Sequence, residues 1–176
     1  MSYLEYAFSY VGVPYGYWSG NAIPRDNSTP FYATNEAPPP RELCMKQGIC
    51  CTGFINLICR RYGIPIPGVA DPTEEFPGGT GAWYKFLQPN LQLFDPAANY
   101  PDGTLLFRPY KDFDDQGHIA LVYHGKTLHS YAYIFEPHTA GVVDPGVSHT
   151  PIWDDYYTYA APPSAWLGLL AASTTQ

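Results

Sequence analysis

Apolar residues recur at helical spacing in three segments of the first half of the chain. The spacing predicts short helices over residues 3–10 and 82–87, and a longer helix that begins at or near Cys51. The longer helix should end at Gly63, because glycine suits the left-handed cap position and the sequence Gly-Ile-Pro cannot continue a helix. Residues 21–48 are polar, include Ala-Pro-Pro-Pro and show no periodicity, so we expect a long loop there.

Short runs of strand type dominate the second half of the chain. The sequence Pro-Asp-Gly predicts a turn that leads into a strand, and residues 118–123 and 126–135 predict two more strands. The last two are joined by His124 and Gly125, which suit a tight two-residue hairpin turn. Because helices come first and antiparallel strands follow, the predicted fold class is α+β, in a single domain over residues 1–176.

The two-residue turn fixes which residues of the hairpin face each other. With this turn, Ala120 faces His129 on the neighbouring strand. His118 lies two residues from Ala120 on the same face, so the imidazoles of His118 and His129 should be close enough to touch. We also expect the small Ala120 to leave room for the helix of Cys51 to pack over this face.

The composition limits the classes of function. The chain has 176 residues, 45% of them hydrophobic, so it can bury a core. A formal net charge of −7 argues against nucleic acid or an anionic membrane surface as a partner. The N-terminus has no basic region, and the apolar run near the C-terminus is too short to span a bilayer. We expect neither a signal peptide nor a transmembrane segment, which fits a cytoplasmic protein or one delivered by a virus particle or an injection system.

The four cysteines are Cys44, Cys50, Cys51 and Cys59. They lack the paired spacing of zinc ligands, so we expect neither a metal nor a cofactor. A disulfide between Cys44 and Cys50 is an alternative. Cys51 is the candidate nucleophile, because the N-terminus of a helix stabilises a thiolate. Cys50 is interpreted as structural, and Cys59 as a small buried apolar residue.

A cysteine nucleophile needs a base, and the predicted hairpin supplies two neighbouring histidines. His118 is the candidate base, and His129 is the candidate third group that orients it. An ion pair between Cys51 and His118 would give a bell-shaped dependence of activity on pH. His138 and His149 are interpreted as loop residues without an evident partner.

Four blocks of the sequence resemble the NlpC-type cysteine peptidases, papain-like endopeptidases best known from bacterial cell walls. "CTGFINLICRRYGIPIPG" looks like the nucleophile helix of that family, which typically shows Asp-Cys-Ser-Gly-Phe and then Gly-Ile-x-Leu-Pro. "PDGTLLF" and "GHIALVYHGKTLHS" resemble its Pro-Gly-Asp-Leu-Leu-Phe and Gly-His-Val-Gly-Ile-Tyr…Ile-His-Ala stretches. "VGVPYGYWSG" resembles the upstream Gly-x-Pro-Tyr-x-x-Gly-Gly. The blocks keep the family's order and cover most of residues 1–135.

The resemblance implies a papain-like fold, in which N-terminal helices include a nucleophile helix packed on a central antiparallel sheet. It assigns Cys51 as the nucleophile, His118 as the base and His129 as the orienting group. It also implies that Tyr15 lines the site and can donate a hydrogen bond near the developing oxyanion, together with the backbone N–H of Cys51. The implied substrate is a peptide or isopeptide amide, such as the γ-D-glutamyl bond of a peptidoglycan stem peptide.

Several departures from the family pattern leave the substrate and the oligomeric state open. Cys50 replaces the usual Asp, Thr52 replaces Ser, and residues at about 19–49 form a long insertion that we expect to line the cleft with aromatic and proline surface. One alternative is a thiol acyltransferase or lipid-directed enzyme of the same superfamily, and another is a catalytically silent binding or structural protein. Asp114 and Asp115, just before the strand of the candidate base, are the alternatives for the orienting role.

Overall fold

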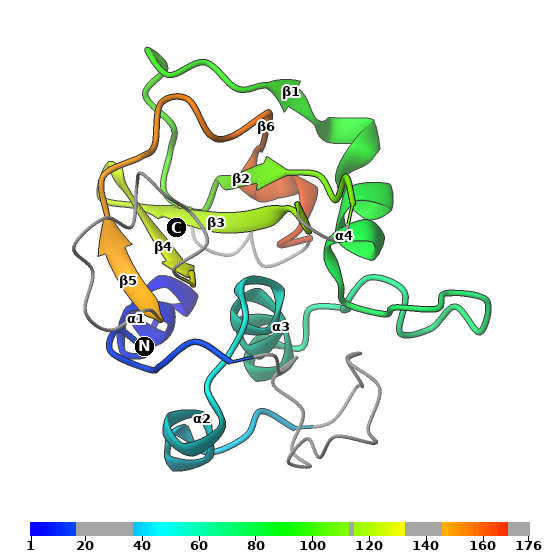
Figure 1. Cartoon of the computed structure of the whole chain (residues 1–176), viewed down its shortest axis with the longest axis vertical. Helices are drawn as coiled ribbons and strands as arrows, with labels where there is room; N and C mark the ends of the chain where they lie inside the picture. Colours follow the sequence, from blue (N-terminus) through cyan, green and yellow to red (C-terminus); the bar gives the residue numbers. More distant parts are fainter. Residues whose placement is uncertain (17–36, 113–114, 133–145, 169–176) are drawn as a thin grey trace.

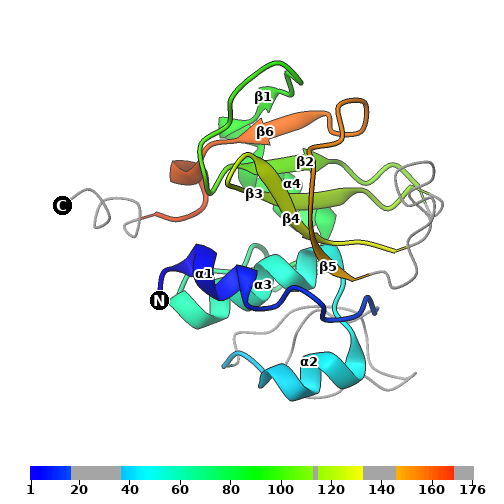
Figure 2. The ribbon, with the colours of Figure 1, turned by 90° about the vertical axis from the view of Figure 1, so that its left-hand side faces the viewer.

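A six-stranded antiparallel sheet with helices on one of its faces forms the framework of the molecule (Figure 1, Figure 2). The computed structural model describes residues 1–16, 37–112, 115–132 and 146–168. The strands are β1 (Gln92–Leu93), β2 (Leu105–Arg108), β3 (His118–Tyr123), β4 (Lys126–Ser130), β5 (Val147–Thr150) and β6 (Tyr159–Ala161). They lie side by side in the order β1-β6-β2-β3-β4-β5. The predicted α+β class is therefore confirmed.

The helices precede most of the sheet in the sequence. They are α1 (Tyr3–Phe8), α2 (Arg41–Gln47), α3 (Cys51–Tyr62) and α4 (Thr80–Leu87), with short 3-10 helices at Gln88–Asn90 and Pro163–Ala165. All three predicted helices are present. Among the described residues, no helix combines the length and the apolar character needed to span a bilayer.

The prediction of a loop over residues 21–48 is wrong at its C-terminal end, where α2 forms. Its sequence, Arg-Glu-Leu-Cys-Met-Lys-Gln, consists mostly of good helix formers, and Gly48 ends the helix with a φ of 72°. The helix is too short for its apolar periodicity to be recognised in the sequence. Residues 17–36, the larger part of the predicted insertion, lie outside the part of the chain that the structure describes.

Helix α3 lies at the centre of the helical layer, and all of its residues from 52 to 59 are buried. It ends at Gly63, whose φ of 66° is the predicted left-handed cap. One of its buried polar residues, Asn56, donates to the Gly78 carbonyl and accepts from Trp83 Nε1, both at 3.0 Å. This satisfied amide ties α3 to α4 and fixes the helix against its neighbour.

Strands β3 and β4 form the predicted hairpin with its two-residue turn. Tyr123 pairs with Lys126, and the residues between them have the positive φ values of a primed turn, 51° at His124 and 70° at Gly125. The pairing of Leu121 with Leu128 continues in this register toward the start of β3. The predicted register of the hairpin is therefore confirmed.

The two faces of the sheet bury two separate groups of side chains. On one face, Ile119 and Leu121 pack with Phe54 of α3. On the other, Ala120 belongs to a second cluster with aromatic residues such as Trp153, to which the described helices contribute nothing. The expectation that α3 packs over the Ala120 face is therefore wrong. The sheet face of Ile119 and Leu121 carries the larger apolar side chains. Helix α3 therefore buries more apolar surface on that face than it would on the Ala120 face.

Candidate active site

The two predicted histidines are in direct contact on the sheet face that lies opposite the helices. His118 Nε2 lies 2.8 Å from His129 Nδ1, and neither residue has solvent-exposed surface. The hairpin register causes this contact, because it places the two residues diagonally on one face. The predicted imidazole contact is therefore present in the structure.

Thr150 extends this pair into a chain of three polar groups. His129 Nε2 lies 2.8 Å from Thr150 Oγ1. The pairing of β4 with β5 places Thr150 opposite Thr127, two residues from His129 along the neighbouring strand. Thr150 could not be predicted from local patterns, because its contact with His129 depends on the pairing of β5 with β4, two strands separated by a long connection in the sequence.

The structure also corrects the interpretation of His149 as a loop residue without a partner. His149 lies in β5 and its Nε2 is 2.8 Å from the Tyr123 carbonyl oxygen. It faces away from Thr150, its neighbour in the strand, because successive side chains of a strand point to opposite faces. His138 lies outside the described residues.

Aromatic rings enclose the histidine pair. The His118 ring is stacked 6.1 Å from Trp153 and lies 5.8 Å from Tyr156 and 6.3 Å from Tyr157, measured between ring centroids. The His129 ring lies 4.8 Å from Trp153. Burial among these groups disfavours the charged imidazolium, so it lowers the pKa of His118 to about 3 and that of His129 well below its ordinary value. Both imidazoles are therefore neutral near pH 7.

Cys51 is the first residue of α3, and as a whole residue it is partly exposed. The backbone N–H of Ile119, the residue after His118, lowers the pKa of the Cys51 thiol, so it lies close to the sulfur atom. The thiol is therefore near the start of β3, the strand of the candidate base. Because α3 packs on the sheet face opposite the histidines, only its N-terminus, with Cys51, lies near the start of β3.

The electrostatics of the site favour neutral groups over an ion pair. Burial and, to a lesser extent, the neighbouring Cys50 raise the pKa of the Cys51 thiol to about 12, while the Ile119 N–H opposes the shift. Burial also lowers the pKa of His118 to about 3. Both shifts favour a neutral thiol and a neutral imidazole, and both oppose a preformed thiolate–imidazolium pair.

Cys50 caps α3 with its sulfur atom. The N–H of Gly53 donates to Cys50 Sγ at 3.3 Å, so a thiol performs here the capping task for which aspartate is preferred. This supports the interpretation of Cys50 as structural. All four cysteines are free thiols, and Cys59 is fully buried, as predicted. Within the described residues, no three His, Cys, Asp or Glu side chains gather as metal ligands would.

Tyr15 lies in an extended segment next to the residues that lead into α3. Its backbone forms a parallel bridge with Ile49, two residues before Cys51. The Ile49 carbonyl also accepts a hydrogen bond of 2.6 Å from Ser130 Oγ of β4. The structure therefore brings together the backbone of Tyr15, the residues that lead into α3 and the strand of His129.

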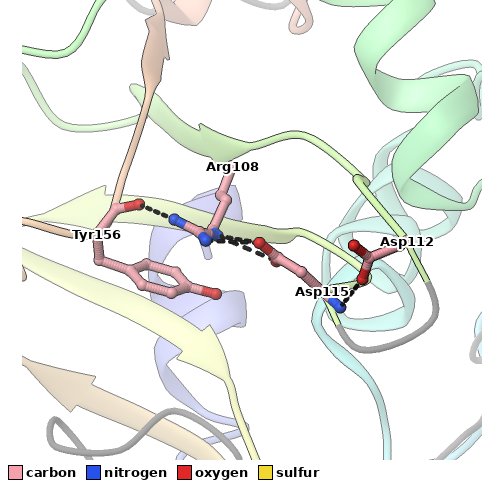
Figure 3. Close-up of polar contacts among 4 residues, drawn as sticks. All are labelled: Arg108, Asp112, Asp115 and Tyr156. Atoms are coloured by element: carbon pink, nitrogen blue, oxygen red, sulfur yellow. Dashed lines mark hydrogen bonds and ion pairs between the residues drawn. The ribbon is translucent and has the colours of Figure 1, made fainter.

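Asp115, an alternative for the orienting role, is committed to another partner. Its carboxylate accepts hydrogen bonds from Arg108 Nε at 3.1 Å and from Arg108 Nη2 at 2.5 Å (Figure 3). The guanidinium holds the pKa of Asp115 below its ordinary value. Asp114 lies outside the described residues. Of the two orienting candidates that the structure describes, His129 is the one in contact with His118.

Comparison with known proteins adds no identification. No family model matches the chain, and neither a curated protein nor a solved structure matches it.

Proposed function

We propose that this protein is a cysteine hydrolase that cleaves a peptide or isopeptide amide through a thioester on Cys51. His118 acts as the base and His129 orients it. The observation that carries the proposal is the chain of polar contacts from the buried His118 and His129 to the partly exposed Thr150, with Cys51 at a helix N-terminus near the start of the strand of His118. The resemblance to NlpC-type peptidases, which rests on the sequence motifs, supports the same residues in the same roles.

The proposed role of His118 as a base determines a direction for each proton in this chain of contacts. A base must keep one ring nitrogen ready to accept the thiol proton, and Nε2 of His118 already faces His129. If Nε2 of His118 carries its proton and donates to His129 Nδ1, then Nδ1 of His118 can accept the thiol proton. His129 is then protonated on Nε2 and donates to Thr150 Oγ1. Thr150 and His129 together hold His118 in the tautomer that a base needs.

The neutral resting pair determines how the reaction starts. Cys51 Sγ attacks the amide carbonyl carbon while its proton passes to His118 Nδ1, so charge develops only during the attack. The backbone N–H of Cys51 and the Tyr15 hydroxyl are proposed to stabilise the oxyanion. The imidazolium then protonates the leaving amine, which leaves a thioester that a water molecule hydrolyses with the help of neutral His118.

The substrate class follows from the resemblance. We propose a peptide or isopeptide amide, with the γ-D-glutamyl bond of a peptidoglycan stem peptide as the first substrate to test. The alternative of acyl transfer shares the thioester and differs only in the acceptor. Residues 17–36, which were expected to shape the substrate cleft, lie outside the described part of the chain.

The test is hydrolysis of purified stem peptides by the wild-type protein and by Cys51→Ala, followed by mass spectrometry. The proposal predicts a cleaved amide with wild type and none with Cys51→Ala, while Cys59→Ala, the control from the same helix, keeps its activity. Adding an amine acceptor separates hydrolysis from acyl transfer, because transfer yields the new amide. Equal cleavage by wild type and Cys51→Ala would contradict the mechanism.

A further inference from the structure

Tyr156 lies beside the candidate base His118, among the aromatic rings that surround the two histidines. Its ring centroid is 5.8 Å from that of His118 and 5.3 Å from that of Trp153. Tyr156 and Cys51 are both partly exposed, whereas His118 and Trp153 are buried. Burial raises the pKa of the Tyr156 hydroxyl, and the Cys51 thiol raises it further, so the two groups are within electrostatic reach of each other. Of these rings around His118, Tyr156 is therefore the one that a substrate can contact when it reaches the candidate base.

Arg108, the last residue of β2, holds Tyr156 in place through two contacts. Arg108 Nη1 donates to the Tyr156 carbonyl oxygen at 3.2 Å, and the guanidinium carbon lies 4.9 Å from the centroid of the Tyr156 ring. Figure 3 shows the ring beside the guanidinium, with Asp115 on the opposite side of the arginine. Because Arg108 pairs with His118 in the β2–β3 ladder, this contact sets the position of Tyr156 relative to the candidate base.

Asp115 in turn holds the arginine. Its carboxylate binds the guanidinium through two nitrogens, and its backbone N–H donates to Asp112 Oδ1 at 2.9 Å (Figure 3). Gly117 follows with a φ of 78°, and a Cβ there would lie 2.5 Å from the Arg108 carbonyl oxygen, so only glycine allows this close approach. The charges of Arg108 and Asp115 compensate each other, so the partly exposed surface beside the candidate base is an uncharged aromatic ring.

We propose that Tyr156 is a specificity residue, whose ring packs against an uncharged, apolar group on the acyl side of the substrate. Arg108 and Asp115 are positioning residues that hold this ring in place. The inference rests on the proposed function, because it takes Cys51 as the point of attack.

Two electrophiles of different size test the inference. Iodoacetamide is too small to depend on contact with the Tyr156 ring. A peptidyl vinyl sulfone with phenylalanine beside the reactive group would pack against this ring. In Tyr156→Ala, the rate constant for modification of Cys51 by the vinyl sulfone should fall about tenfold, since an aromatic contact of this kind is lost. The iodoacetamide rate constant should stay within about twofold of wild type. Tyr156→Phe keeps the ring and should retain both rates.

A matched control is Tyr62→Ala. Tyr62 is also a partly buried tyrosine near a guanidinium, that of Arg61 at 5.7 Å, but it lies at the opposite end of α3 from Cys51. This variant should leave the ratio of the two rate constants unchanged. Asp115→Asn, which loosens Arg108, should lower the vinyl sulfone rate by less than Tyr156→Ala does.

The outcomes separate the two proposals. If both probes modify Cys51 but their ratio in Tyr156→Ala equals that of wild type, the specificity role is overturned and the proposed nucleophile stands. If neither probe modifies Cys51 in wild type, the proposed function fails and the specificity role fails with it. A test that needs no variant compares vinyl sulfones with phenylalanine and with glutamate on wild type. The phenylalanine probe should react faster, and equal rates would overturn the inference.

Discussion

At the scale of single residues, the account depends on the unequal roles of two histidines in contact. His118 is proposed to accept the thiol proton, whereas His129 only accepts a hydrogen bond that holds His118 in place. Losing the base should therefore cost more than losing the residue that orients it.

Substitutions of the two histidines test these roles. His118→Ala should reduce kcat/KM nearly as far as Cys51→Ala does, whereas His129→Ala should keep a measurable fraction. His129→Gln retains a hydrogen-bond acceptor and should recover part of the loss. Steady-state kinetics on the cleaved stem peptide measures each effect, with circular dichroism as the control for folding. A His129→Ala variant as active as wild type would show that another group orients His118.

The pH dependence of the reaction tests the neutral resting pair. Since burial lowers the pKa of His118 to about 3 and raises that of Cys51 to about 12, both groups stay neutral over a wide range between these values. The rate should therefore show a broad plateau through neutral pH, with an acid limb where His118 becomes protonated. A narrow bell centred near neutrality would instead indicate the preformed ion pair expected from the sequence motifs alone.

At the scale of elements, sequence patterns predicted the features that depend only on residues close together in the chain. The hairpin of β3 and β4 and the helix α3 follow from a turn pair, a cap and an apolar stripe, and each lies where the sequence places it. The pairing of Thr150 with β4 and the sheet face that α3 covers depend on contacts between distant segments. These features could not be read from periodicity, which describes each element without its neighbours.

Two glycines test the backbone argument for the helix ends. At Gly63 and at Gly81, an added Cβ would meet no atom within 4 Å, so only backbone conformation distinguishes the two sites. Gly63 has a φ of 66°, and Gly63→Ala should lower the free energy of unfolding by about 1 kcal/mol. Gly81 is in the first turn of α4, and Gly81→Ala should raise it by about 0.5 kcal/mol. Urea denaturation measures both, and changes of the same sign would contradict this explanation.

At the scale of the whole molecule, the buried histidines make the free energy of unfolding depend on pH. In the unfolded chain both imidazoles titrate near their ordinary pKa of about 6.5, whereas burial keeps them neutral in the folded protein. As the pH falls below about 6.5, the unfolded state binds protons that the folded state does not bind, so the free energy of unfolding decreases. The loss should approach about 1 kcal/mol per pH unit for each buried imidazole.

His129→Gln should remove one imidazole's share of this slope between about pH 6.5 and 5, above the range where carboxylates titrate. The matched control is His124→Asn, because His124 is exposed in the hairpin turn and asparagine tolerates its positive φ. Urea denaturation at several pH values measures the slope. An unchanged slope in His129→Gln would show that His129 is protonated in the folded protein.

The central claim is that His118 activates the thiol of Cys51, and the labelling rates of the four cysteines test it most directly. A brief pulse of iodoacetamide near pH 7, analysed by peptide mass spectrometry, should modify Cys51 much faster than the other three, which are buried. Exposure alone would give the same order, so the decisive comparison is with His118→Ala, shown to be folded by circular dichroism. The account predicts that the Cys51 rate falls at least about tenfold in that variant. An equal Cys51 rate in wild type and His118→Ala would contradict it.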